Sequence, residues 1–182
     1  ERGTDDPRTW PPTRLAQVRR WEAAAAMAVL GVREHTVGDF PDGGLARCDP
    51  AGIAWATRLI RDTAPDTILT FDACGATFHP DHIAVHRWVT RAWEALGRPC
   101  RLLYAVASAG HLAEFAERYE EWGIYMGDAR PTGVPDEQLT VQLFLTGATL
   151  DRKVAALRTM ASQTADAYAT LDSLAITAAV MG

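Results

Sequence analysis

The sequence predicts an α/β protein built as a layered sandwich with a mainly parallel sheet. Residues 66–72 are largely apolar and rich in β-forming side chains, a pattern typical of a strand that is covered on both faces. Helical runs flank this segment, and a second strand-like run follows at 101–107. Strands that alternate with helices are typical of parallel sheets, so the order of the elements predicts the fold class.

Proline and glycine mark the ends of the expected helices. Pro12 stands at the start of the first helix and Gly31 follows its end, which is the usual punctuation. Asp49 caps the second helix, and a third begins at about His79 and stops near Gly97. In chain order we expect helices at 13–30, 49–64, 79–96, 109–122, 150–165 and 166–182, strands at 66–72, 101–107 and 139–145, and a short edge strand at 32–37.

Composition narrows the class of protein. A chain of 182 residues with 48% hydrophobic residues favours a single globular domain, 1–182. The net charge of −5 and the lack of a basic cluster argue against a nucleic-acid partner or an anionic membrane surface. The longest apolar runs, 23–30 and 174–181, are too short to span a membrane.

Three cysteines, Cys48, Cys74 and Cys100, form no C-x-x-C pair. Their odd number favours reduced thiols in a cytoplasmic protein over a disulfide framework. Cys74 lies in the loop after the 66–72 strand, where metal or redox chemistry is one interpretation and a small buried thiol is the more common one.

The segment 69–87 carries the candidate chemistry. It predicts a strand, a loop, and a helix that opens on His79, Pro80, Asp81 and His82. Ligands of open α/β sheets bind beyond the carboxyl ends of the strands, and imidazole and carboxylate are common zinc ligands. His86 lies one turn beyond His82, a spacing that also occurs in zinc-binding helices. The plain alternative is that His79 only caps the helix and His86 only packs against it.

Several segments, in the same order along nearly the whole chain, resemble the LmbE-like family of zinc-dependent N-deacetylases. This family includes N-acetylglucosaminyl-phosphatidylinositol de-N-acetylase and the mycothiol-pathway deacetylase and amidase. The segments are Asp5–Arg8, Arg19–Ala23, Leu30–Val32, Pro41–Leu45, Pro65–Asp72, His79–His86, Lys153–Leu157 and Ser162–Gln163. The resemblance implies a Rossmann-like three-layer sandwich.

The resemblance also implies roles for individual residues. His82 matches a metal ligand, and His79 matches a histidine that stabilises the oxyanion of the tetrahedral intermediate. Asp81 would orient an imidazole or cap the helix. Asp42 matches a substrate contact, with a plain turn aspartate as the alternative. Phe78, in the loop before the histidines, is a candidate pocket residue for substrate, with core packing as the alternative.

The chain departs from the family pattern in three places. The family's first strand ends in a His-Pro-Asp-Asp motif that supplies two metal ligands and the base, and His79-Pro80 is the one His-Pro pair here. We therefore expect a single LmbE-like domain whose first strand and helix lie upstream of the printed sequence. Thr77 and Phe78 replace a frequent tyrosine and glycine, and Met160 replaces a frequent histidine.

Two functions follow from the sequence. The first is a hydrolase, using Zn²⁺ or another divalent metal, that removes the acyl group from an N-acetylated amino sugar or glycoconjugate. The alternative is an inactive small-molecule binding module on the same fold. Family members often form homo-oligomers, so such an assembly is also an expectation. A nucleotide-binding Rossmann protein is disfavoured, because no G-x-G-x-x-G follows a predicted strand.

Overall fold

The structure is a computed structural model that describes residues 6–165 of the chain. It divides into two compact units, which are described separately. The central unit is Phe40–Val141, and the terminal unit comprises the described parts of Glu1–Asp39 and Gln142–Gly182. The elements are α1 (Pro12–Leu30), η1 (Leu45–Arg47), α2 (Asp49–Thr63), β1 (Thr67–Phe71), α3 (Gly75–Phe78), α4 (Pro80–Ala95), β2 (Arg101–Ala105), α5 (Ala109–Glu121), η2 (Asp136–Gln138) and α6 (Gly147–Arg158).

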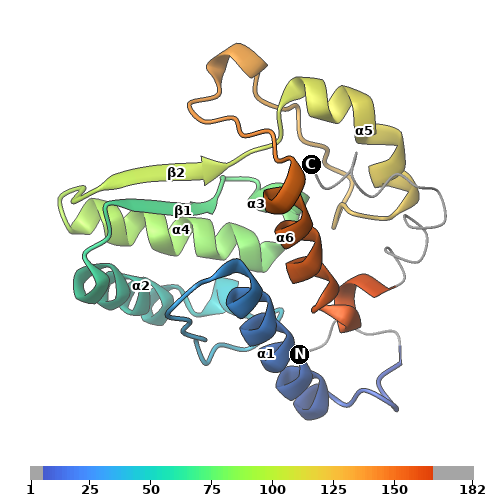
Figure 1. Cartoon of the computed structure of the whole chain (residues 1–182). Helices are drawn as coiled ribbons and strands as arrows, with labels where there is room; N and C mark the ends of the chain where they lie inside the picture. Colours follow the sequence, from blue (N-terminus) through green and yellow to red (C-terminus); the bar gives the residue numbers. More distant parts are fainter. Residues whose placement is uncertain (1–5, 166–182) are drawn as a thin grey trace. The chain divides into compact units, whose positions relative to one another are not determined.

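A parallel pair of strands and the helix between them form the centre of the Phe40–Val141 unit. β1 and β2 pair in register from Thr67 opposite Arg101 to Phe71 opposite Ala105. The connecting helix α4 runs along the pair (Figure 1). A hydrogen bond of 3.0 Å between the hydroxyls of Thr90 and Tyr104 ties α4 to β2. This strand–helix–strand unit confirms the predicted α/β class, whereas the Rossmann-like three-layer arrangement stays a prediction.

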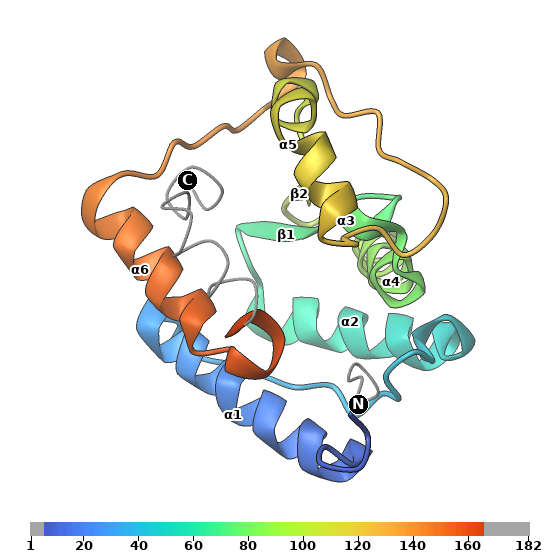
Figure 2. The ribbon, with the colours of Figure 1, turned by 90° about the vertical axis from the view of Figure 1, so that its right-hand side faces the viewer.

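The hydrophobic core of this unit lies where α2 packs against α4, and the two helices lie side by side in Figure 2. Trp88 of α4 is only 2% exposed. Its ring covers Gly52 of α2, where a Cβ atom would come within 2.1 Å of the ring. Only glycine therefore fits at this crossing. Ile60 and Ala84 complete the buried centre.

One polar contact accompanies this packing at the start of α2. The Arg87 side chain donates to both carboxylate oxygens of Asp49 at 2.8 Å, and Trp88 Nε1 donates to one of them at 2.7 Å. The hydrogen bond from Arg87, aided by that from Trp88, holds the pKa of Asp49 below its ordinary value.

The segment after α5 folds back toward the loop that follows β1. The Met126 amide donates to the Thr77 carbonyl at 2.9 Å, and Val134 forms an isolated parallel bridge with Ser108. The Arg130 guanidinium pairs with the Glu120 carboxylate of α5. These contacts place residues 130–134 beside the carboxyl ends of both strands.

In the terminal unit, α1 packs against α6. The Glu22 carboxylate accepts from the Ser162 amide at 2.7 Å and from the Ser162 hydroxyl at 2.6 Å. Two of the segments that carry the family resemblance, Arg19–Ala23 and Ser162–Gln163, are thus in direct contact. Their role in this structure is to connect distant parts of the chain.

The predictions of two strands are wrong. Residues 32–37 and 139–145 form no strand, and Leu143 and Phe144 are 73% and 81% exposed. A strand needs a neighbour for its backbone N–H and C=O groups, and neither segment has one within residues 6–165. The strands predicted at 66–72 and 101–107 are confirmed, as are the helices that flank them. The helix expected from 166 to the end lies outside the described residues.

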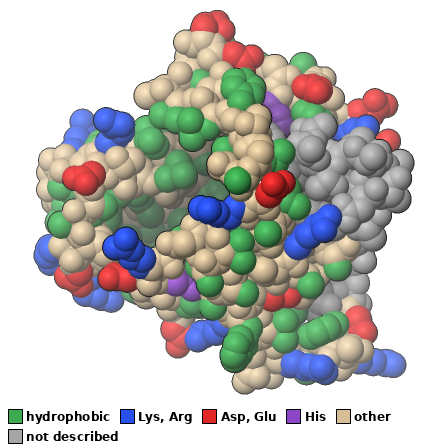
Figure 3. Space-filling view, in the orientation of Figure 1, with side chains coloured by type: hydrophobic (Ala, Val, Ile, Leu, Met, Phe, Trp, Pro, Cys, Tyr) green, Lys and Arg blue, Asp and Glu red, His purple; other side chains and the backbone are tan. Residues whose placement is uncertain are grey.

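The surface carries mixed charge on the face shown in Figure 3, where Lys and Arg side chains are interspersed with Asp and Glu. Within the described part of the chain, no helix is both long enough and apolar enough to cross a membrane.

Candidate functional site

The candidate site is at the N-terminus of α4. His79 is the N-cap with extended backbone angles, and Pro80 occupies the first helical position, where its fixed φ is already suited to a helix. This start places Asp81 and His82 in the first turn. The rings of His79 and His82 lie 4.9 Å apart between centroids. The structure therefore brings together the three residues expected to carry the chemistry.

The backbone fixes the proton on the His79 ring. Its Nδ1 accepts a hydrogen bond of 3.1 Å from the Asp81 amide. An amide N–H only donates, so Nδ1 carries no proton, and in the neutral ring the proton is on Nε2. The His79 side chain therefore caps α4 through one nitrogen and presents an N–H donor through the other.

The His82 ring is held in the opposite tautomer. Its Nδ1 lies 3.0 Å from the Gly75 carbonyl oxygen, which only accepts, so Nδ1 carries the proton and Nε2 keeps its lone pair. The ring also stacks on Phe71, with 4.3 Å between centroids and 4° between planes. A donated Nδ1–H and a free Nε2 are the usual state of a metal-binding histidine.

Gly75 makes this contact possible. It has a φ of +66°, and a Cβ atom there would lie 2.8 Å from Cβ of His82 and 2.9 Å from the Ile83 amide nitrogen. Any larger residue would push the loop away from α4. The glycine thus allows the loop after β1 to reach and orient the His82 ring.

Asp81 is 7% exposed and holds a distant turn. Its Oδ2 accepts from the Gly43 amide at 2.6 Å, and its Oδ1 accepts from the Leu45 amide at 3.0 Å. Both oxygens are thus engaged by backbone groups of residues 41–45. This anchoring contact is one that the sequence reasoning did not foresee.

Asp42 lies in the turn that Asp81 anchors. The Gly44 amide donates to the Pro41 carbonyl at 3.0 Å, and Gly43 has a φ of +69°, which suits glycine at the third position of the turn. Asp42 is half-buried. The contact with Asp81 therefore links the Asp42 turn to the start of α4.

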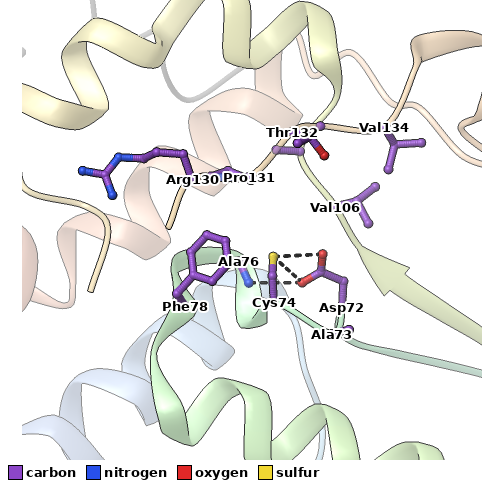
Figure 4. A pocket seen from close by; sticks show the side chains of 12 residues that line it. Asp72, Ala73, Cys74, Ala76, Phe78, Val106, Arg130, Pro131, Thr132 and Val134 are labelled. Atoms are coloured by element: carbon purple, nitrogen blue, oxygen red, sulfur yellow. Dashed lines mark hydrogen bonds between the residues drawn. The ribbon is translucent and has the colours of Figure 1, made fainter. Parts of the chain in front are cut away.

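A cavity of about 320 Å³ lies beside these residues, beyond the ends of β1 and β2 (Figure 4). Phe78 is one of its lining residues and has a φ of +61°. Ala76 has a φ of +63°. The loop thus holds two residues in a backbone region that costs each about 1–3 kcal/mol. The lining comprises Asp72, Ala73, Cys74, Ala76, Phe78, Val106, Ala107 and residues 130–134.

Asp72 and Cys74 interact at the edge of this cavity. The Cys74 thiol lies 3.1 Å from both carboxylate oxygens of Asp72, and the Ala76 amide donates to Oδ1 at 3.2 Å. Burial, and then the Asp72 carboxylate, raises the pKa of the Cys74 thiol. Cys74 is therefore a protonated donor to Asp72 at neutral pH.

His86 connects α4 to β1. Its Nδ1 lies 2.9 Å from the Phe71 carbonyl oxygen, and its ring contacts Tyr104 at 5.0 Å between centroids. The Phe71 carbonyl fixes the proton of His86 on Nδ1, just as the Gly75 carbonyl fixes the proton of His82. The packing interpretation of His86 thus accounts for its contacts in this structure.

Sequence reasoning missed the part of the cavity formed by Val106, Thr132 and Val134. Val106 directly follows β2, so the rule that ligands bind beyond the carboxyl ends of parallel strands could have identified it. Thr132 and Val134 had no such signal, because the bridge between Ser108 and Val134 joins residues far apart in the sequence.

Of the residues at the start of α4, His82 has the chemistry of a metal ligand. The free Nε2 of His82 suits Zn²⁺, which typically has three protein ligands at a catalytic site. Among residues 6–165, no group of three or more His, Cys, Asp or Glu side chains is placed to hold a metal ion. His82 therefore fits as one ligand of a larger set.

Comparisons with known proteins agree with the resemblance seen in the sequence. The family model of GlcNAc-PI de-N-acetylase (PIG-L) matches residues 1–93. A 1D-myo-inositol 2-acetamido-2-deoxy-alpha-D-glucopyranoside deacetylase of Acidothermus cellulolyticus is 33% identical, over 83% of this chain and 60% of its own length. Proteins of the same name from Thermobispora bispora and Thermomonospora curvata are 30% and 32% identical, each over 82% of this chain.

The chain spans about 60% of the length of these relatives. No solved structure gives a significant match to the chain. The family match covers residues 1–93, which include the Asp42 turn, β1 and the start of α4, and so contains all five predicted site residues. On this evidence the chain belongs to the PIG-L family, that of GlcNAc-PI de-N-acetylase.

Proposed function

We propose that the full-length protein is a metal-dependent N-deacetylase that acts on an N-acetylated amino sugar conjugate. The observation that carries the proposal is the opposite placement of the ring protons in His79 and His82. One ring offers an N–H donor and the other a lone pair, and the ring centroids are 4.9 Å apart. Amide hydrolysis needs both, a donor for the oxyanion and a ligand for a Lewis acid.

In this proposal Zn²⁺ is the metal and Nε2 of His82 is one of its ligands. When bound, Zn²⁺ supplies Lewis-acid polarisation of the amide carbonyl and lowers the pKa of water. The Gly75 carbonyl keeps the His82 lone pair directed away from the loop by fixing the proton on Nδ1.

His79 stabilises the transition state. As the acetamide carbon becomes tetrahedral, negative charge develops on the carbonyl oxygen, and Nε2–H of His79 donates to that oxygen. The Asp81 amide holds the ring, so little reorganisation is needed at the moment of reaction. Removal of one such donor typically slows turnover about 10²–10³-fold.

Asp81 and Asp42 contribute through the turn at 41–45. Asp81 positions this turn with two backbone hydrogen bonds. In this proposal the half-buried Asp42 accepts hydrogen bonds from sugar hydroxyls. The names of the relatives specify a 2-acetamido sugar joined to inositol, which supports an N-acetylated amino sugar as the substrate class.

The test uses the full-length protein with Zn²⁺ and 1D-myo-inositol 2-acetamido-2-deoxy-α-D-glucopyranoside, with release of acetate as the readout. We expect His82→Ala to lose both bound metal and activity. We expect His79→Ala to keep the metal and to slow turnover about 10²–10³-fold. His35→Ala is the control, because His35 is exposed in the terminal unit. Full activity in His82→Ala, or sugar binding without any acetate release by the wild type, would contradict the proposal.

A further inference from the structure

The cavity beside the candidate site is lined by residues other than the two histidines of that site. It lies beyond the ends of β1 and β2 and is lined by three segments, 72–78, 106–107 and 130–134. Neither His79 nor His82 is among its lining residues. A group that occupies this cavity is therefore held by side chains other than the two imidazoles.

The size of the cavity suits a group larger than acetyl. Its volume of about 320 Å³ is at the lower end of the range of about 300–1,000 Å³ that pockets for small organic ligands occupy. An acetyl group has three heavy atoms and would leave most of that space empty. A ring or a short chain would fill it.

The walls are predominantly apolar. Phe78, Val106, Ala107, Pro131 and Val134 provide apolar surface on several sides, and Figure 4 shows Val106 and Val134 on the side opposite Phe78. Apolar walls with a few polar groups are typical of pockets for small organic ligands.

The charged side chains around the cavity are already engaged by the protein. Asp72 accepts from the Cys74 thiol and the Ala76 amide. The Arg130 guanidinium pairs with Glu120, donates to two loop carbonyls and lies over the Tyr125 ring. A polyol placed here would lose hydrogen bonds to water and find few replacements, which costs free energy.

We propose that this cavity binds an apolar aglycone, an aryl or alkyl group attached to the N-acetylated amino sugar. The inference rests on the proposed deacetylase function and names the substrate class more closely. It follows from an apolar cavity of this size that shares the loop 72–78 with the candidate site but lacks its two imidazoles.

The experiment compares benzyl and methyl 2-acetamido-2-deoxy-α-D-glucopyranoside as substrates of the full-length protein with Zn²⁺. We expect kcat/KM to be at least tenfold higher for the benzyl glycoside. Val106→Asp places a carboxylate in the wall at a residue that is 40% exposed, and should reduce this ratio to about one. Val141→Asp is the matched control, because Val141 is 52% exposed and outside the lining, and should keep the ratio.

The outcomes separate this inference from the function on which it rests. Turnover with equal kcat/KM for both glycosides would overturn the aglycone site and leave the deacetylase function standing. A Val106→Asp-sensitive preference for an N-octanoyl over an N-acetyl methyl glycoside would assign the cavity to the acyl chain, which also overturns the inference.

If neither glycoside is turned over, equilibrium binding decides. Calorimetry would compare the benzyl and methyl 2-amino-2-deoxy-α-D-glucopyranosides, which cannot be deacetylated. Tenfold tighter binding of the benzyl compound, lost in Val106→Asp, would support the cavity assignment without turnover. Equal binding would overturn the cavity assignment, and acetate release from the inositol conjugate would still decide the deacetylase function.

Discussion

At the scale of single residues, His79 and His82 are identical side chains with different backbone partners. An amide of the first helical turn donates to one ring, and a loop carbonyl accepts from the other. The sequence places both in one tetrapeptide but contains no information on which nitrogen meets which backbone group. That difference arises only when Gly75 brings its carbonyl to α4.

These partners make a direct prediction for NMR. Long-range ¹⁵N–¹H correlation spectra of the imidazoles at neutral pH should show His79 with its proton on Nε2 and His82 with its proton on Nδ1. The reason is that Nδ1 of His79 accepts and Nδ1 of His82 donates. His82→Ala and His79→Ala variants assign the signals. The reverse pattern of protons would remove the main support for the proposed function.

A second residue-scale prediction concerns Cys74. Burial and the Asp72 carboxylate raise its pKa, so its thiol should react slowly with iodoacetamide at pH 8. Asp72→Asn removes the negative charge, lowers the Cys74 pKa toward its ordinary value and increases the thiolate fraction. We expect severalfold faster alkylation of Cys74, measured by peptide mass spectrometry. Cys100 is the internal reference, and equal acceleration at both cysteines would indicate general unfolding instead.

At the scale of elements, the contact between α2 and α4 combines packing with one ion pair. Gly52 allows Trp88 to lie directly on α2, and the Trp88 N–H and the Arg87 guanidinium both reach Asp49. The proline and glycine pattern predicted the ends of both helices. It could not predict this crossing, because a close approach depends on which residues of the two helices face each other.

The Asp49 pair predicts a pH dependence of stability. Its pKa is lowered in the folded protein, so the stabilisation is fully present above about pH 5 and is lost as the pH falls below about 3.9, the ordinary aspartate value. Asp49→Asn should therefore lower the free energy of unfolding at pH 7 by about 1 kcal/mol, since the pair is partly exposed.

Urea unfolding at pH 7 and pH 3 measures this effect. The difference between wild type and Asp49→Asn should be smaller at pH 3, because below about 3.9 the unfolded carboxylate takes up a proton more readily than the folded one, whose pKa is lowered. Glu114→Gln on α5 serves as the control, because Glu114 is exposed. A difference that is the same at both pH values would show that the carboxylate charge is not responsible.

The C-terminal end of α2 gives another element-scale prediction. Ala64 ends the helix with a φ of +42°, in the left-handed region. In the folded protein, that conformation costs a residue with a Cβ atom about 1–2 kcal/mol, and glycine avoids this cost. Glycine also raises the entropy of the unfolded chain, which opposes folding by the smaller amount of about 0.4–1 kcal/mol. Ala64→Gly should therefore raise the thermal midpoint slightly. Ala51→Gly within the same helix is the control and should lower it.

At the scale of the whole molecule, local pattern and long-range contact differ in how well sequence predicts them. Residues 66–72 and 101–107 formed strands as expected, because each finds a parallel partner in the other. The run at 139–145 has similar β-propensity but no partner within residues 6–165, so its propensity does not produce a strand. Strand formation depends on a neighbour that periodicity does not reveal.

The candidate site shows the same limit. His79, Asp81 and His82 are neighbours in the sequence, so their proximity was predictable. The hydrogen bonds from Gly43 and Leu45 to Asp81 join residues that are 38 and 36 positions apart in the sequence. Val134 lies about 60 positions after the loop 72–78 with which it lines the cavity. Family resemblance gave Asp42 a role, but only the fold shows that Asp81 holds its turn.

The two ends of the described chain meet in the terminal unit. Glu22 accepts from the amide and the hydroxyl of Ser162, residues 140 positions apart. Glu22→Gln should lower the free energy of unfolding by about 1–2 kcal/mol, because hydrogen bonds to a charged acceptor are the stronger kind. A double-mutant cycle with Ser162→Ala tests the pair, and additive effects would show that the two side chains are not coupled.

Metal binding should stabilise the full-length protein as a whole. A ligand that binds only the folded state adds RT ln(1 + [L]/Kd), about 4 kcal/mol at a thousandfold excess over Kd. Zn²⁺ should therefore raise the thermal midpoint of the wild type relative to a sample with chelator. The shift should disappear in His82→Ala, which lacks the free Nε2, and persist in His79→Ala, whose ring acts as a donor. Equal shifts in the wild type and His82→Ala would mean that the metal is held without this histidine, and the role derived from the Gly75 contact would then be wrong.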